Sequence, residues 1–263
     1  MPSPVLPCPT PLFRAAFIIG VLLTVADAAT SQGWEITHPE AEFHMARLMP
    51  SGSQASRGGW RPWYAIDWPE AEDHLSQGLR RLTRLEVADD SVHIRAVDDR
   101  IFDHPWLFAQ QVGRWTLSIE ETDRLREYLM RGGFLVVDDF HGAREWANFA
   151  EMIQRMLPGY PIIEIPDDDP LLHVLYDLDR NTQIPGARHL YRGPGGQILA
   201  QLPGGPPHWR GIYDNERRLL VAINYNMDMG DAWEHADDPW YPNPMTALAY
   251  RFAINYIIYA MTH

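Results

Sequence analysis

The middle of the chain alternates short apolar runs with amphipathic stretches. Residues 134–137 (FLVV) are apolar throughout, as expected of a strand covered on both faces of a sheet. The stretch before them opens with Ser118 and Glu121, a capping-box pattern, and residues 142–157 after them carry an apolar stripe at helical spacing. Further strands are predicted at 105–112 and, as a buried strand, at 160–165. This alternation of strands and helices predicts right-handed crossovers and a parallel sheet, and therefore an α/β fold.

The flanking segments add further elements. Residues 42–48 are predicted as a strand, and a helix opening at Pro69 and Glu70 places Ala71, Leu75, Leu79 and Leu82 on one face. Later strands are predicted at 197–202, 209–213 and 217–223, with a hairpin turn at 214–216. Residues 245–261 form an apolar stretch interrupted by Arg251 and Asn255, which favours a buried helix over a membrane span.

The first 29 residues have the pattern of a signal peptide. An apolar run at 15–26 follows Arg14, and Ala26-Asp27-Ala28 supplies a small-x-small cleavage pattern. We therefore expect export to the periplasm or the cell exterior, with a cleaved leader favoured over an uncleaved N-terminal anchor. Residues 30–263 are then expected to form a single domain, with no stable membrane insertion after leader removal.

Charge and cysteine usage narrow the classes of function. The formal net charge of -13 disfavours nucleic acid and anionic membrane surfaces as partners, because like charges repel. Cations, basic proteins and neutral polymers such as glycans remain open. The only cysteine is Cys8, which precedes the apolar run of the leader. A mature chain would therefore have no disulfide, no thiol nucleophile and no cysteine metal site.

Two acidic loops, residues 138–146 and 226–242, follow predicted strands directly. Ligands of open parallel sheets bind beyond the carboxyl ends of the strands, so both loops are predicted to lie at the functional edge. In the first loop, Asp138 or Asp139 could simply cap the following helix. Asp139 could also orient His141 as a base, or the loop could bind a divalent cation through oxygen and nitrogen.

The second loop gathers five acids, Asp228, Asp231, Glu234, Asp237 and Asp238, together with His235 and without Lys or Arg. The spacing of Asp228, Asp231 and Glu234 places three carboxylates on one face if the segment is helical. A cation could offset their repulsion. Two other interpretations stay open: turn chemistry with Glu234 paired to Arg251 or Arg210, and a protein-binding loop.

The candidate residues fall into three overlapping sets. The candidate catalytic residues are Asp139, His141 and Glu234, and the candidate metal ligands are Asp138, His141 and Asp228. The candidate ligand-binding residues are Asp138, Asp139, His141, Trp146, Trp209, Arg210, Asn226, Asp228, Asp231, Trp233, Glu234 and His235. Most tryptophans of the chain are expected to be packed rather than to form a sugar-stacking surface.

Several blocks of the sequence resemble the bacterial "domain of unknown function 4159" family. They include LREYLMRGGFLVVDDFHG (125–142), QIPG (183–186), PHWRGIYD (207–214) and NYNMDMGDAWEHADDPWYP (224–242). The resemblance covers about residues 42–263. It implies a flavodoxin-like, class I glutamine amidotransferase-like three-layer sandwich with a mostly parallel sheet. It also implies relatives in larger membrane-anchored proteins, encoded near MoxR-type ATPases and von Willebrand A-domain proteins. Without a cysteine nucleophile, this chain is not expected to hydrolyse glutamine as amidotransferases do.

Together these observations favour a non-catalytic module of the cell envelope that binds a small ligand or an envelope protein. A divalent cation is the cofactor that its carboxylates could hold. One alternative is a metal-assisted hydrolase that uses Asp138, Asp139, His141, Asp228 and Glu234. Another is a structural subunit of an envelope assembly, with tryptophan-rich loops as its contact surface.

Overall fold

The computed structural model describes residue 1 and residues 41–52, 61–178, 182–201 and 204–263. All the helices and strands belong to one compact unit, residues 36–263. The predicted leader and most of the loop at 51–59 lie outside the described residues. No helix in the described ranges is both long and apolar enough to cross a membrane.

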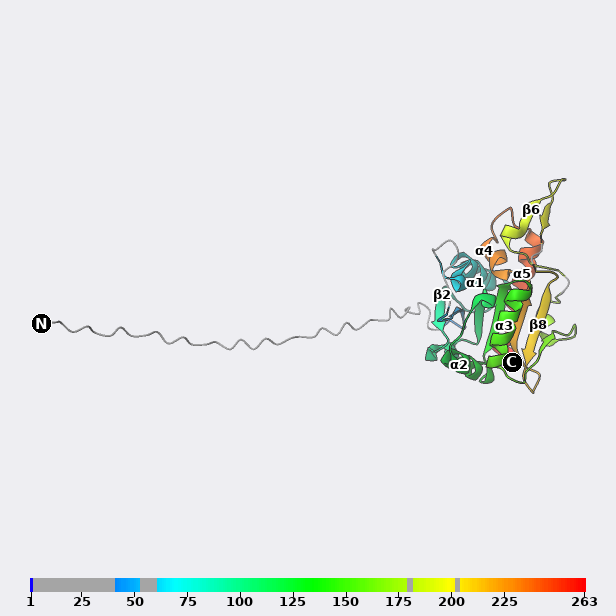
Figure 1. Ribbon diagram of the computed structural model, residues 1–263. Coiled ribbons are helices and arrows are strands. Elements are labelled where there is room, and N and C mark those ends of the chain that lie inside the picture. The colour runs from blue at the N-terminus through cyan, green and yellow to red at the C-terminus, as the bar shows by residue number, and fades with distance from the viewer. Residues whose placement is uncertain (2–40, 53–60, 179–181, 202–203) are drawn as a thin grey trace. The chain divides into compact units, whose positions relative to one another are not determined.

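The centre of the fold is a seven-stranded mixed sheet in the order β2-β1-β3-β4-β9-β8-β5. The strands are β1 (Phe43–Met49), β2 (Val87–Arg95), β3 (Trp106–Gln110), β4 (Phe134–Phe140), β5 (Ile162–Glu164), β8 (His208–Tyr213) and β9 (Leu219–Tyr225). The first five strands of the order pair in parallel, and β8 is antiparallel to both of its neighbours. A separate hairpin, β6 (Leu190–Arg192) and β7 (Ile198–Ala200), stands outside this sheet (Figure 1).

Helices cover both faces of the sheet. The α-helices are α1 (Glu70–Leu82), α2 (Ile119–Met130), α3 (Gly142–Met156), α4 (Met229–Glu234) and α5 (Asn243–Thr262). Short 3-10 turns occur at η1 (Trp63–Ala65), η2 (Asp99–Asp103), η3 (Val112–Arg114), η4 (Pro170–Leu172) and η5 (Ala187–His189). Phe134 and Val136 pack with α1, α4 and α5, whereas Leu135 and Val137 pack with α2 and α3. The alternation of β4 side chains therefore builds two cores, and the predicted three-layer α/β fold with a mostly parallel sheet is confirmed.

Sequence patterns predicted most elements, with three corrections. The capping box of Ser118 and Glu121 is present at the start of α2. The apolar run at 160–165 is not a buried strand: β5 covers only Ile162–Glu164, is largely exposed and pairs antiparallel at the sheet edge. β2 was not predicted, because Asp89, Asp90 and Ser91 interrupt its apolar pattern. Leu82 is exposed at the end of α1 and does not share the buried face.

A buried arginine ties the segment before α1 to the sheet. Arg47 of β1 is fully buried and forms an ion pair with Glu72 of α1, which is also fully buried. The same guanidinium donates to the carbonyls of Tyr64 and Ile66, at 3.0 and 3.1 Å, and to the side chain of Gln110 at the end of β3. These contacts fix the turn that precedes α1 above the carboxyl ends of β1 and β3.

We predict that Arg47→Met strongly destabilises the fold. The substitution keeps an apolar stem but leaves Glu72 as an uncompensated buried charge, which costs about 3–5 kcal/mol. Urea unfolding gives the free-energy difference. The double variant Arg47→Met/Glu72→Met should recover part of the loss because it removes both charges. If Arg47→Met lowers the free energy of unfolding by less than about 1 kcal/mol, the buried ion pair is contradicted.

Candidate functional site

The carboxyl ends of the central strands carry an unusual backbone. Asp67, Gln111, Asp139 and Asn226 have φ values of 66°, 56°, 51° and 62°, in the left-handed region that residues with a side chain rarely adopt. Gln111 follows β3, Asp139 lies near the end of β4, and Asn226 follows β9. Strained backbone of this kind persists where surrounding contacts hold it, and it clusters at functional sites.

Five aspartates converge at this edge, and we call them the acidic group: Asp67, Asp138, Asp139, Asp228 and Asp231. The first four are buried, and Asp231 is partly buried. Asp67, Asp228 and Asp231 each offer a carboxylate oxygen, and these three atoms lie within 4.8 Å of one another. The two predicted loops therefore meet, and the segment before α1 contributes a third carboxylate.

Asp138 joins the two acidic loops directly. Its Oδ2 accepts the backbone N–H groups of Met229 and Gly230, at 2.7 and 3.2 Å, in the first turn of α4. Asp228 caps the same helix by accepting the N–H of Asp231 at 3.1 Å. Burial raises the pKa of Asp138 to about 6, although the hydrogen bonds from Gly230 and Met229 act in the opposite direction.

Asp139 lies between neutral and cationic partners. Its carboxylate accepts from the amide of Gln111 and lies 3.4 Å from the guanidinium of Arg188 and 3.7 Å from Nδ1 of His141. Burial, followed by repulsion from Asp231 and Asp138, raises the pKa of Asp139, whereas Arg188 lowers it. Burial and the charge of Arg188 lower the pKa of His141 to about 3, so its imidazole is neutral at physiological pH.

Residues 183–189 cover the second loop. The N–H of Asp228 donates to the carbonyl of Ile184 at 2.9 Å, and the N–H of Ala187 donates to Oδ2 of Asp231 at 2.7 Å. Gly186 lies so close that a Cβ atom there would come within 2.5 Å of Asp228 Oδ2 and 2.8 Å of Asp231 Oδ2. A backbone without a side chain thus forms one wall of the site.

Burial and mutual repulsion act on the acidic group together. Both effects raise the pKa of Asp67 and of Asp228 well above the ordinary value of 3.8, with burial the larger cause in each case. For Asp228 the repelling charges are led by Asp139 and Asp231. The cluster therefore favours either protons or a bound cation over a set of free negative charges.

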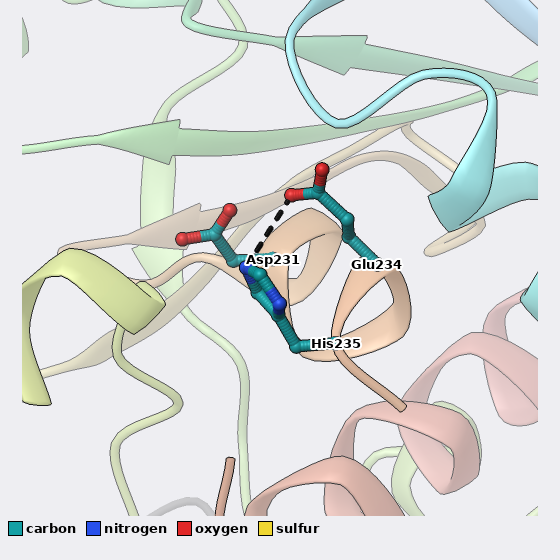
Figure 2. A group of neighbouring side chains, drawn as sticks. All are labelled: Asp231, Glu234 and His235. Atoms are coloured by element: carbon teal, nitrogen blue, oxygen red, sulfur yellow. Dashed lines mark ion pairs between the residues drawn. The ribbon is translucent and has the colours of Figure 1, made fainter. Parts of the chain in front are cut away.

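A second set of potential metal ligands lies on the outer side of α4. Asp231, Glu234 and His235 each offer a ligand atom, all within 4.8 Å of one another (Figure 2). Glu234 Oε2 and His235 Nε2 form an ion pair at 3.6 Å. Glu234 and His235 are partly exposed, so solvent screens the charges of this set more than those of the buried carboxylates.

Other candidate residues lie elsewhere or already have structural roles. Trp209 stacks on Phe252 with ring centroids 3.6 Å apart, and Trp233 packs on Phe108 with ring centroids 5.2 Å apart. Both tryptophans lie within the core. Asn226 is buried, and its side chain accepts the N–H of Gly142 and donates to the carbonyls of Gly204 and Pro206.

Trp146 and Arg210 form a separate pair. The guanidinium of Arg210 lies 4.4 Å from the Trp146 ring centroid and 5.6 Å from the Tyr225 ring centroid. Arg210 is also held by Glu164 of β5, the residue opposite it in the antiparallel ladder. These contacts tie α3 to the sheet edge, and the pair remains a candidate binding surface.

Two interpretations of the loops were wrong. Neither Asp138 nor Asp139 caps α3, because β4 continues through both and His141 occupies the N-cap position. Glu234 does not pair with Arg210 or Arg251: Arg210 pairs with Glu164, and Arg251 lies over Tyr176. An arginine does reach the acidic group, but it is Arg188.

Four important neighbours of the acidic group were not predicted from the sequence. Asp67 and Arg188 each stand apart from the acidic loops in the chain, and Gln110 and Gln111 continue an apolar strand. The short block QIPG, which ends at Gly186, was the one available signal, because it is among the blocks that resemble the family and it lies in the covering segment.

The fold and site define a three-layer α/β domain with a buried acidic centre at the carboxyl edge of its sheet. The family "Domain of unknown function (DUF4159)" matches residues 56–261. The chain therefore belongs to the DUF4159 family, as its sequence blocks predicted. A search of curated proteins finds no match.

We predict that Asp138→Asn changes how stability depends on pH. The folded pKa, about 6, lies above the ordinary 3.8, so this group's stabilisation is complete below about pH 4 and is lost as pH rises through 6. Asn keeps an acceptor for α4 but does not titrate. Relative to the native protein, the variant should gain up to about 3 kcal/mol between acidic and neutral pH.

Urea unfolding in EDTA at a series of pH values measures this difference. Asp237→Asn, which removes a carboxylate at an exposed position of the second loop, is the matched control. A constant difference between Asp138→Asn and the native protein at every pH would contradict the raised pKa.

Proposed function

We propose that this chain is a binding module of the cell envelope that holds its ligand with the help of a divalent cation at Asp67, Asp228 and Asp231. The convergence of these three carboxylate oxygens carries the proposal. Two oxygens bound to one ion at about 2.1–2.4 Å lie at most about 4.8 Å apart. The three atoms meet that limit before any side chain has moved.

The ligand chemistry indicates the kind of ion. All three side chains offer oxygen, which suits the hard cations Mg²⁺, Ca²⁺ and Mn²⁺. The chain's only cysteine, Cys8, lies outside the described domain, so thiolate ligation of softer ions is excluded there. A divalent charge would also offset the repulsion that raises the pKa of Asp228.

Binding is better supported than hydrolysis. A general base works best when its pKa lies near the operating pH, and His141, with a pKa of about 3, is a weak base. Asp138 has a pKa of about 6, but its Oδ2 already accepts two N–H groups of α4, which gives this carboxylate a structural role. Thiol-based amidotransferase chemistry lacks its nucleophile. The burial of Trp209 and Trp233 also weakens the case for a tryptophan-rich assembly surface. Export to the envelope rests on the leader-like sequence at 1–29.

We predict that Ca²⁺, Mg²⁺ or Mn²⁺ raises the Tm of the EDTA-treated protein. At a hundredfold excess over Kd, binding adds about 2.7 kcal/mol, or a rise of roughly 5–10 °C for a domain of this size. Asp228→Asn should abolish this rise, and because Asn also caps helices well the fold should be kept. It should also raise the Tm in EDTA, because one repelling charge is lost.

Asp237→Asn serves as the control, since it removes one acid of the same loop at an exposed position. Its metal response should equal that of the native protein. Calorimetric titration with each ion gives the stoichiometry, expected to be one. The proposal fails if no ion raises the Tm, or if Asp228→Asn and Asp237→Asn respond alike.

We predict that Gly186→Ala weakens cation binding at least tenfold while the protein stays folded. The added methyl group would lie against the oxygens of Asp228 and Asp231 and push them from their positions. Titration of the metal into the variant measures the loss. Unchanged affinity would mean that Asp228 and Asp231 are not ligands.

A further inference from the structure

A cavity outside the acidic group lies between η1, η3 and one face of α3. Its volume is about 620 Å³, which is within the range of small-molecule sites. We call it the α3 groove and define it by Trp63, Arg114, Thr116, Arg144, Asn148 and Glu151. Arg144, Asn148 and Glu151 are spaced along one side of the helix, so they line the groove in a row.

The lining is polar, and its charges balance. Arg114 forms an ion pair with Glu145 at 2.7 Å, so these two charges offset each other. Arg144 and Glu151 add one charge of each sign, and neither has an ion-pair partner among the residues that the structure describes. A groove with no net charge does not select an anion such as nucleic acid, and a polar lining does not select a hydrocarbon.

The groove offers both hydrogen-bond donors and acceptors. The Arg144 guanidinium is a donor, the Glu151 carboxylate is an acceptor, and the Thr116 hydroxyl is both. Asn148 donates its amide N–H groups to the carbonyls of Gly113 and Trp115, at 3.0 and 3.1 Å, which leaves its Oδ1 as an acceptor. Such a mixture matches hydroxyl groups, each of which donates and accepts.

An aromatic ring completes the groove. Trp63 is half-buried, and the guanidinium of Arg114 lies 4.2 Å from its ring centroid. Trp combines a broad apolar face with a polar edge, which suits a ligand that is apolar on its ring faces and polar at its rim. Pyranose rings have this character, since their C–H groups lie on the faces and their hydroxyls at the rim.

We propose that the α3 groove binds a neutral oligosaccharide. Arg144, Asn148 and Glu151 would contact its hydroxyls, and Trp63 would pack on a ring. This site needs no cation, so it goes beyond the function proposed above. Arg114 connects it to the acidic group, because Arg114 donates to Gln111 at 2.8 Å and Gln111 donates to Asp139.

The test is titration of the protein with three neutral probes: cellotetraose, maltotetraose and tetra-N-acetylchitotetraose. At least one should bind with a Kd of about 1 mM or tighter, measured by calorimetry and by saturation-transfer NMR. Trp63→Ala and Arg144→Ala should each weaken that binding at least tenfold. Arg144 is exposed, so its variant is expected to fold even if the Trp63 variant does not.

Trp240→Ala is the matched control, because Trp240 also carries an arginine, Arg192, over its ring but lies outside the groove. Its saccharide affinity should equal that of the native protein. Repeating the titration in EDTA separates the two proposals, since saccharide binding should persist without a cation. Failure of all three probes to bind, or equal binding by the Arg144 and Trp240 variants, overturns the oligosaccharide site.

Discussion

The bond between the Asp138 carboxylate and the first turn of α4 organises the functional edge of this protein. This buried side chain at the end of β4 accepts hydrogen bonds from two N–H groups of α4, which lie 91 and 92 residues further along the chain. Helix N-termini carry a partial positive charge, so the contact satisfies the helix and the carboxylate together. Asp228 is the N-cap residue of α4, and Asp231 lies in its first turn. Fixing the start of α4 against β4 therefore also fixes the positions of both aspartates.

Burying several carboxylates side by side requires compensation from elsewhere in the fold. Gln110 donates to Asp67, Gln111 donates to Asp139, and the backbone of Ala187 donates to Asp231. Arg47 in turn holds Gln110, and Glu72 holds Arg47, so a continuous polar chain runs from α1 through the sheet to the acidic group. Arg47 Nη2 and Glu72 Oε2 are buried without a hydrogen-bond partner among the described residues, but the other contacts of this network hold its members in place. The rigidity explains how left-handed backbone at four positions can be maintained.

The sequence predicted the layers of the fold better than the details of the site. Continuous apolar runs such as 134–137 mark central strands reliably, because both of their faces are covered. Edge strands do not follow this pattern. β2 is a strand although polar residues interrupt it, and the apolar run around β5 is largely exposed although it is nearly continuous. The position of the acidic loops followed from the rule that functional groups lie at the carboxyl ends of strands. Asp67 and Arg188 could not be predicted, because only the tertiary fold brings isolated residues from distant segments to that edge.

The acidic group draws on residues from Asp67 to Asp231, which lie 164 positions apart in the chain. Contacts between such distant segments form late, because closing long loops costs entropy before any contact compensates for it. A partly synthesised chain therefore has scattered aspartates and no assembled centre. The proposed cation site would form only with completion of the tertiary fold, so retained metal would report the integrity of the whole domain.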